Sequence, residues 1–200
     1  MVPTNLIILI GGSGTGKTTL ARALQERLLP DQWLHISPDT LLYCLPKSTV
    51  DRADFANDWS AVDITLIAEL AHGCIREALQ SGARVVFDCV VMTERRAKQL
   101  LAAFDGSDPF LVGTTCAWDE LLRRTKVRGD RTLEEVQRGF QTGGQFLEVD
   151  CVLDTTASPP ERLVDQLLSH LENRGSASAW HRNLTRYAQP PLHRGGASCA

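Results

Sequence analysis

Residues 11–18 read Gly-Gly-Ser-Gly-Thr-Gly-Lys-Thr, a complete G-x-x-x-x-G-K-[S/T] phosphate-binding loop. Its glycines permit positive φ angles and a close approach of backbone to ligand. Its N–H groups, with the dipole of a following helix, attract phosphate oxygens. We expect Lys17 to reach the β- and γ-phosphates of a nucleotide and the Thr18 hydroxyl to bind Mg²⁺. The residues predicted to bind nucleotide here are Gly11, Gly12, Ser13, Gly14, Thr15, Gly16, Lys17, Thr18 and Thr19.

The sequence on either side gives this loop the context that phosphate binding needs. Residues 5–10 form a short apolar run typical of a buried strand, and Leu20, Leu24 and Leu28 have the spacing of an amphipathic helix. A chance glycine-rich turn is the alternative, but such a turn needs neither a strand before it nor a helix after it. The sequence therefore predicts binding of a nucleoside triphosphate, which we take to be ATP.

Asp39 follows the expected second strand, residues 33–37, and lies in the first turn of a short helix that Pro38 opens. Ligands of open α/β sheets bind at the carboxyl ends of the strands. A carboxylate there would accept the proton of a substrate hydroxyl as it attacks the γ-phosphate. The alternative is an acidic residue placed to interact with the helix dipole, and position alone favours neither.

Asp88 ends the expected third strand, residues 84–88, after mostly apolar residues, as in a Walker B motif. In that role Asp88 holds Mg²⁺ directly or through water, beside Thr18. Aspartate also ends many strands because it favours turns. The phosphate loop makes the metal-binding role the preferred interpretation.

Three arginines, Arg124, Arg128 and Arg131, surround a glycine between two expected helices. Guanidinium groups suit the negative charge that spreads over the phosphoryl oxygens during transfer. We predict that residues 120–147 form a mobile lid over ATP, with all three arginines catalytic and Arg128 also in contact with the nucleotide. The alternative is a solvated, charged turn between helices.

Thr155 follows the expected fifth strand within the sequence Asp154-Thr155-Thr156. Kinases of this architecture place the loop around the nucleotide base at this position, so Thr155 is predicted to contact the nucleotide. An ordinary Asx or Ser/Thr turn explains the same residues equally well.

Strands and helices alternate along the chain, as in parallel sheets covered by helices. We expect an α/β fold of the three-layer P-loop NTPase class, similar to nucleotide kinases, with a five-stranded parallel sheet and a helical lid. The last two strands are expected at residues 110–114 and 151–154, and capping boxes at residues 132–135 and 158–161 predict helix starts. Residues 46–61 read as polar and irregular.

The expected domain is a P-loop kinase domain over residues 1–174. From residue 175 the composition shifts to Ser, Gly, Pro, Arg and His with little periodicity. Segments of this kind rarely bury enough apolar surface to fold. Residues 175–200 are therefore predicted to be a disordered or loosely attached tail that the fold and activity do not need.

Composition narrows the class of protein further. A length of 200 residues fits one domain, and a formal net charge of −3 gives no reason to expect a nucleic acid partner. No apolar run has the length of a membrane span, and the N-terminus lacks the basic region of a signal peptide. The six cysteines are scattered without a C-x-x-C pair, which favours reduced thiols in a cytoplasmic protein.

Several stretches together resemble chloramphenicol phosphotransferase and its relatives, a family of small P-loop kinases. The resemblance spans about residues 5–172. In order along the chain it rests on Gly11-Gly12-Ser13, Gly16-Lys17, Leu28-Leu29-Pro30, Trp33-Leu34 with Asp39, Gly82-Ala83-Arg84-Val85-Val86-Phe87-Asp88, Arg128-Gly129-Asp130-Arg131 and Asp154-Thr155-Thr156.

The resemblance implies transfer of the ATP γ-phosphate to a primary hydroxyl of the acceptor, with the catalytic base at Asp39 and lid arginines at Arg124, Arg128 and Arg131. The sequence departs from the family pattern at residues 47–59, where relatives have a longer, glycine-rich acidic stretch. It also has Cys89 in place of a carboxylate and lacks a Val-His pair at residues 141–144. The phosphoryl-transfer residues match better than the acceptor pocket does.

The sequence is therefore compatible with three functions. The first is an ATP- and Mg²⁺-dependent O-phosphotransferase acting on a hydroxylated small molecule, similar to chloramphenicol 3-O-phosphotransferase. The second is another small-metabolite P-loop kinase, and the third is a nucleotide-binding regulatory module. A switch would show a guanine-binding motif or D-x-x-G after the third strand, where this chain has Asp88-Cys89-Val90-Val91.

Overall fold

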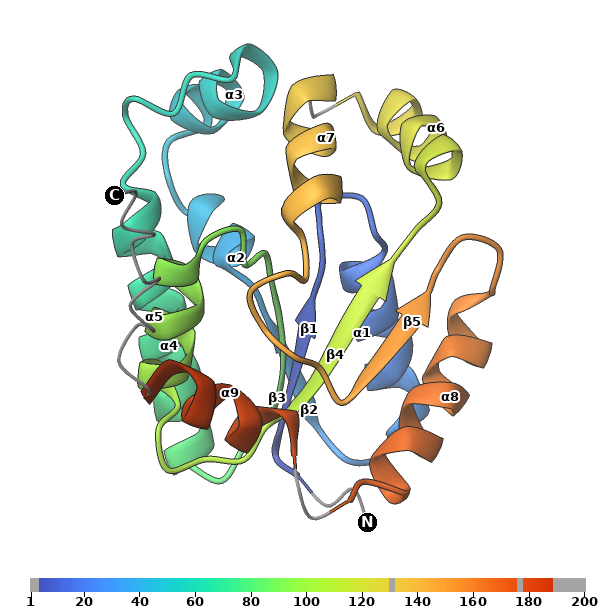
Figure 1. The fold of residues 1–200 in the computed structure, drawn as a ribbon. Helices are drawn as coiled ribbons and strands as arrows, with labels where there is room; N and C mark the ends of the chain where they lie inside the picture. The colour runs from blue at the N-terminus through green and yellow to red at the C-terminus, as the bar shows by residue number, and fades with distance from the viewer. Residues whose placement is uncertain (1–3, 130–131, 176–177, 189–200) are drawn as a thin grey trace, which may run out of the picture.

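The computed structural model of the protein describes residues 4–129, 132–175 and 178–188. Its centre is a parallel sheet of five strands with the spatial order β2-β3-β1-β4-β5 (Figure 1). The strands are β1 (Leu6–Ile10), β2 (Trp33–Ile36), β3 (Arg84–Cys89), β4 (Phe110–Thr115) and β5 (Cys151–Asp154). Since β1 lies between β3 and β4, the loop after β1 emerges at the centre of the carboxyl edge of the sheet.

Helices connect and cover these strands. They are α1 (Lys17–Arg27), α2 (Pro38–Leu42), α3 (Lys47–Ala56), α4 (Ile64–Gln80), α5 (Glu94–Ala103), α6 (Trp118–Arg128), α7 (Leu133–Thr142), α8 (Pro160–Glu172) and α9 (Ala179–Ala188). None of the helices in the described part of the chain is long and apolar enough to span a membrane.

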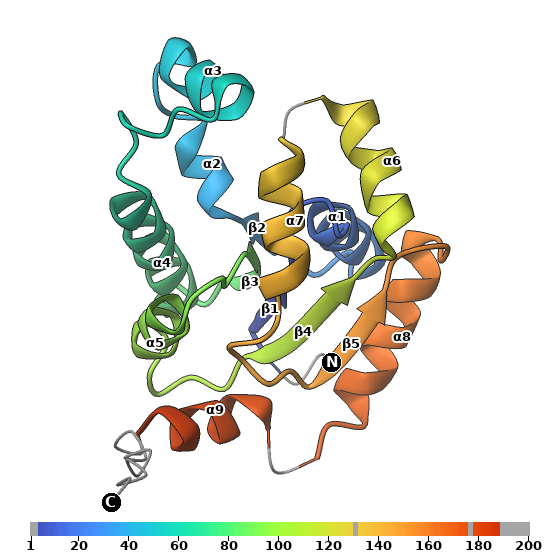
Figure 2. The same ribbon diagram turned by 45° about the horizontal axis from the view of Figure 1, so that its top comes forward.

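The core has two layers, one on each face of the sheet. Because side chains alternate along a strand, Leu6, Ile8 and Ile10 of β1 enter one cluster, whereas Ile7 and Leu9 enter the other. Helices α4, α5 and α9 cover the first face and α1 and α8 cover the second (Figures 1 and 2). All of β1 is buried, as expected for a central parallel strand, and the predicted three-layer fold is confirmed.

Local sequence explains most helix starts. The capping box predicted at α7 is present. The Thr132 hydroxyl accepts a hydrogen bond from the Glu135 N–H, and the Glu135 carboxylate accepts one from the Thr132 N–H. The second predicted box is wrong, because α8 begins at Pro160 with no side-chain cap. Proline presets the φ angle of a first helical turn and has no N–H to satisfy, so Ser158 is not needed as a cap.

The segment expected to be irregular, residues 46–61, contains helix α3. Its buried residues are Val50, Ala53 and Asp54, and Ala53 packs with Leu42, Val62 and Ile67 in a small separate cluster. The helix ends at Asn57, which adopts the left-handed conformation at φ 52°. With so few apolar positions, α3 shows little helical periodicity in the sequence.

The prediction of a loose tail is wrong for residues 178–188, whereas residues 189–200 lie outside the described residues. Helix α9 seats Trp180 in the core with no exposed surface. The Asn183 amide, also fully buried, donates to the Glu148 carbonyl and accepts from the Glu148 N–H, at 2.9 Å each. Trp180, Leu184 and Tyr187 share one helical face, a short apolar stripe inside a polar stretch.

Replacing Trp180 with alanine should destabilise the protein by about 3–5 kcal/mol, the usual cost of deleting a large buried aromatic side chain. Arg186→Ala, at an exposed position of the same helix, should change the free energy of unfolding by no more than about 0.5 kcal/mol. Urea unfolding followed by circular dichroism measures both. Equal stabilities for the two variants would mean that α9 contributes nothing to the core.

Candidate active site

A cleft of about 1100 Å³ opens at the carboxyl edge of the sheet. Its walls come from the loop after β1, the start of α2, the first half of α4, the end of β3 and the lid helices α6 and α7. These segments are far apart in sequence and meet because parallel strands all end at this edge. The cleft brings together most of the residues predicted to do chemistry.

The loop after β1 has the backbone conformation that its glycines permit. Gly14 and Gly16 have φ angles of 81° and 86°, which side chains disfavour. A Cβ on Gly11 would lie 2.3 Å from the Thr114 hydroxyl oxygen. Helix α1 starts directly after Gly16 with no side-chain cap and no acidic residue in its first turn, so its first N–H groups suit an external anion.

Lys17 is folded into this loop. Its Nζ donates hydrogen bonds to the carbonyl oxygens of Gly11 and Gly12, both at 2.9 Å, and the residue is 7% exposed. Burial lowers the pKa of Lys17, while the negative charges of Asp88 and Asp39 oppose that shift. The ammonium group thus stands at the junction of the loop and the cleft.

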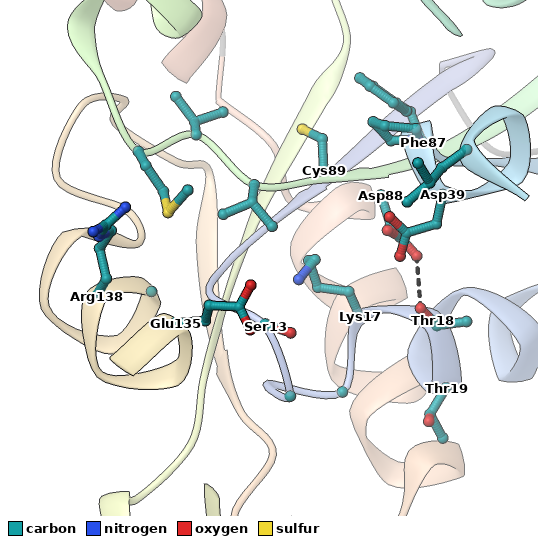
Figure 3. A pocket seen from close by; sticks show the side chains of 18 of the residues that line it. Ser13, Lys17, Thr18, Thr19, Asp39, Phe87, Asp88, Cys89, Glu135 and Arg138 are labelled. Carbon is teal, nitrogen blue, oxygen red and sulfur yellow. Dashed lines mark hydrogen bonds between the residues drawn. The ribbon is translucent and has the colours of Figure 1, made fainter. Parts of the chain in front are cut away.

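Asp88 connects the first turn of α1 to β2. Its Oδ2 accepts from the Thr18 hydroxyl at 2.9 Å (Figure 3) and lies 2.9 Å from Nε2 of His35. Burial raises the pKa of Asp88, but the hydrogen bond with His35 and the charge of Lys17 outweigh it, so the pKa lies below its usual value. Asp88 is therefore ionised at neutral pH.

Sequence reasoning missed His35. It lies opposite Val86 in the register of β2 with β3, two residues before Asp88. The alternating side-chain directions of a strand put Val86 and Asp88 on the same face, which would have indicated the contact once β2 and β3 were known to be neighbours.

Thr18 and Asp88 offer one hydroxyl and one carboxylate oxygen to a cation. Mg²⁺ prefers oxygen ligands and is often held by one or two protein groups, with waters and substrate phosphates completing the shell. Among the described residues no three His, Cys, Asp or Glu side chains cluster as a metal site. The donor set therefore suits a Mg²⁺ ion that arrives with a nucleotide.

Asp39 lies in the first turn of α2, which Ser37 caps through its side chain. The residue is exposed and lines the cleft. In Figure 3 its carboxylate and that of Asp88 point into the same part of the cleft, near Lys17. Asp39 of α2, Asp88 of β3 and Lys17 of α1 thus lie together in one part of the cleft.

Arg124 links the lid to the phosphate loop. Its guanidinium donates to the Thr155 carbonyl at 2.6 Å, to the Thr155 hydroxyl at 3.1 Å and to Glu120 at 2.8 Å. The Thr155 hydroxyl in turn lies 2.9 Å from the Thr15 carbonyl oxygen, as donor. Thr155 therefore holds the backbone of the phosphate loop by a hydrogen bond, and Arg124 holds Thr155.

Arg128, at the end of α6, is exposed and lines the cleft, whereas Arg131 lies outside the described residues. Sequence reasoning missed Arg138 of α7, which also lines the cleft (Figure 3). Its spacing of three from Glu135, another lining residue, puts both on one helical face. That spacing is the signal that would have found it.

Helix α7 touches the phosphate loop backbone to backbone. A Cβ on Gly139 would lie 3.3 Å from the Ser13 nitrogen, and one on Gly12 would lie 2.7 Å from the Gly139 carbonyl oxygen. A Cβ on Gly143 would lie 2.9 Å from the Gly12 nitrogen. The glycines at 139 and 143 thus allow this lid helix to rest directly on the loop.

The other end of the cleft is largely apolar. Leu42, Ile67 and Phe87 line it, together with the Cys89 thiol, whose pKa burial raises to about 12. His72 also lines this end and is 8% exposed. An organic molecule with an apolar body fits such a surface.

A five-stranded parallel sheet of this order, with a phosphate loop after β1 and a helical lid, defines a P-loop kinase. The chain belongs to the chloramphenicol phosphotransferase-like family, whose description, "Chloramphenicol phosphotransferase-like protein", matches residues 4–172.

Individual relatives agree with this class. The chain is 33% identical over 180 residues to "Putative O-phosphotransferase Rv2636" of Mycobacterium tuberculosis, covering 81% of this chain and 80% of that protein. In fold it is similar to a sugar kinase from Janibacter sp. HTCC2649, with a TM-score of 0.65, 18% identity and coverage of 85% and 95%. The Mycobacterium tuberculosis APS kinase CysC gives a TM-score of 0.60 at 15% identity, covering 84% and 96%.

The buried imidazole in the cleft makes stability depend on pH. Burial, with the charges of Arg76 and Arg96, lowers the pKa of His72 from 6.5 to about 4. Between these pH values His72 is protonated in the unfolded chain but stays neutral in the folded protein. The free energy of unfolding therefore falls as the pH falls. This contribution is complete above pH 6.5 and lost by about pH 4.

His72→Phe should therefore flatten the loss of stability between pH 6.5 and 4, by roughly 3 kcal/mol in total. Urea unfolding at a series of pH values measures the slope. His170→Gln, at an exposed position of α8, controls for the loss of one imidazole. If His72→Phe retained the slope of the unmodified protein, His72 would not be held neutral by the fold.

Proposed function

We propose that the protein transfers the γ-phosphate of ATP to a hydroxyl group of a small molecule. The observation that carries this proposal is the exposed carboxylate of Asp39, which faces the same part of the cleft as Lys17 and Asp88 and adjoins the apolar end. The family and the mycobacterial O-phosphotransferase relative support it. ATP use and the absence of disulfides at the five described cysteines also fit a cytoplasmic location.

The phosphate loop would bind the triphosphate through the backbone of residues 11–19. Thr18 and Asp88 would hold Mg²⁺, which supplies charge neutralisation at the phosphates when bound. His35 keeps the Asp88 carboxylate oriented through its hydrogen bond. Thr155 would act by holding the loop in shape, since its hydroxyl is already bonded within the protein.

Asp39 would accept the proton of the acceptor hydroxyl as its oxygen bonds to the γ-phosphorus and the bond to the ADP oxygen breaks. Lys17 and Arg128 would donate to the phosphoryl oxygens, where negative charge develops. Arg124 would act as a positioning residue, because its donors are committed to Thr155 and Glu120. Arg131 remains a candidate for the same lid on sequence grounds.

Chloramphenicol itself is one possible acceptor, and another metabolite alcohol is the alternative within the same chemistry. Asn57 and Trp59, from the segment that departs from the family sequence, line the cleft beside α2 and the start of α4. The acceptor therefore cannot be read from the name of the family. A regulatory nucleotide-binding module would have no use for Asp39 beside an apolar pocket.

Asp39→Asn should lower acceptor-dependent ADP release about 10²- to 10⁴-fold, because the amide keeps the shape but removes the basic oxygen. ATP affinity should be nearly unchanged. The measurement is ADP release by both proteins, with and without members of a panel of hydroxylated small molecules that includes chloramphenicol. Equal rates of ADP release by both proteins, with and without acceptor, would exclude the kinase function and favour a nucleotide-binding module.

Arg128→Ala should lower kcat about 10- to 100-fold, the usual effect of losing one hydrogen bond to a charged group. It should weaken ATP binding less, since the charge it meets develops in the transition state. Lys126→Ala, on the exposed side of the same helix, is the matched control. A change confined to the KM for ATP would make Arg128 a binding residue only.

A further inference from the structure

Two polar side chains in the acceptor end of the cleft have no part in the proposed transfer chemistry. They are His72 of α4 and Arg96 of α5, and both line the cleft. We call the part of the cleft between α4, α5 and the end of β3 the distal arm. Its other walls are apolar, with Ile67, Phe87 and Leu100 among them.

His72 is an almost fully buried imidazole whose ring nitrogens have no hydrogen-bond partner within the described part of the chain. Its ring packs edge-on against Phe87 and Phe104, with centroids 5.7 and 5.5 Å away. A neutral imidazole carries one N–H donor, and the ring nitrogens of His72 are not among the fully buried, unpartnered polar atoms of the described residues, so they are accessible from the cleft. Because His72 borders the cleft, a ligand in the distal arm would satisfy it.

Arg96 of α5 reaches across to α4 at Thr65, which lies seven residues, or about two turns, before His72 on the same helical face. Its guanidinium is half-buried and donates to two neutral oxygens, at Thr65 (3.4 Å) and Gln99 (3.3 Å). In the described residues it forms no ion pair with a carboxylate.

Glu69 and Asp63 are the acids whose charges act on Arg96, and neither forms an ion pair with it in the described part of the chain. The Asp63 carboxylate caps α4 by accepting hydrogen bonds from the backbone N–H groups of Thr65 and Leu66, both at 2.9 Å. Glu94 pairs with Lys98 at 2.7 Å. A guanidinium with two long bonds to neutral partners retains donors that match the two oxygens of a carboxylate.

We propose that the distal arm binds a carboxylate group of the acceptor, with Arg96 and His72 as its donors. The substrate class is then a hydroxy acid: the hydroxyl lies at Asp39, an apolar body lies along the cleft and the carboxylate lies at Arg96. The guanidinium of Arg96 offers paired N–H donors that match the two oxygens of a carboxylate, and the imidazole of His72 offers one more donor. This inference names the acceptor class of the proposed kinase and therefore rests on that function.

Binding of benzoate and benzamide, measured by isothermal titration calorimetry, tests the arm without any turnover. Benzoate should bind more tightly than benzamide, and Arg96→Gln should weaken benzoate binding about 10- to 100-fold while leaving benzamide unchanged. Arg95→Gln removes an adjacent, exposed charge and should have no such effect. Arg96→Lys should recover part of the affinity, because it restores the charge but not the paired donors.

His72→Phe keeps an aromatic ring in the arm and removes the donor. It should weaken benzoate binding about 3- to 10-fold, as expected for one hydrogen bond. Inorganic sulfate and phosphate, titrated in parallel, should bind more weakly than benzoate. Tighter binding of phosphate would replace the carboxylate with a phosphorylated acceptor and overturn the proposal.

Turnover provides the second test. Hydroxy acids whose apolar spacer grows by one methylene at a time should show a maximum of ADP release at one length, and their primary amides should show a much higher KM. Arg96→Gln should abolish the preference for acid over amide. Melting curves of each variant confirm that it is folded.

The two tests separate the two proposals. Benzoate binding that depends on Arg96, without turnover of any alcohol, would support the carboxylate site and contradict the kinase function. Turnover of amides as fast as acids, with benzoate binding unaffected by Arg96→Gln, would support the kinase and overturn the carboxylate site.

Discussion

The active-site end of this protein depends on a positive charge held out of water. Moving an ammonium ion from water into a protein interior costs several kcal/mol, and Lys17 is nearly buried. Two loop carbonyls and the nearby charge of Asp88 offset that cost. The compensation requires β1 and β3 to be neighbours in register, with Leu9 opposite Asp88, so the strand order is a condition for the site.

Much of the remaining architecture supports the loop that surrounds this charge. Arg124 and Thr155 hold it from the side of β5, and Gly139 of α7 rests on it from the side of the lid. The lid helices are thus tied to the phosphate loop by side chains at one point and by backbone at another. The end of the cleft between α2, α4 and α5 is lined by other elements and does not share these contacts.

The sequence was sufficient for the features that are local in the chain. The phosphate loop, the alternation that makes a parallel sheet and the capping box at Thr132 each depend on residues within a few positions. The sequence was insufficient where contacts join distant segments. His35 meets Asp88 only because β2 lies beside β3. Trp180 can be recognised as a core residue only once the face of the sheet that α9 covers is known. Helix α3, whose buried residues are Val50, Ala53 and Asp54, has too few buried apolar positions to show a period.

The glycine contact between α7 and the phosphate loop has a mechanical consequence. Side chains absorb small displacements by changing rotamer, but Gly12 and Gly139 meet through backbone atoms alone. Close-packed backbone transmits displacement with little loss. Neither backbone segment can therefore move toward the other without a clash, so the position of α7 and the shape of the phosphate loop constrain each other.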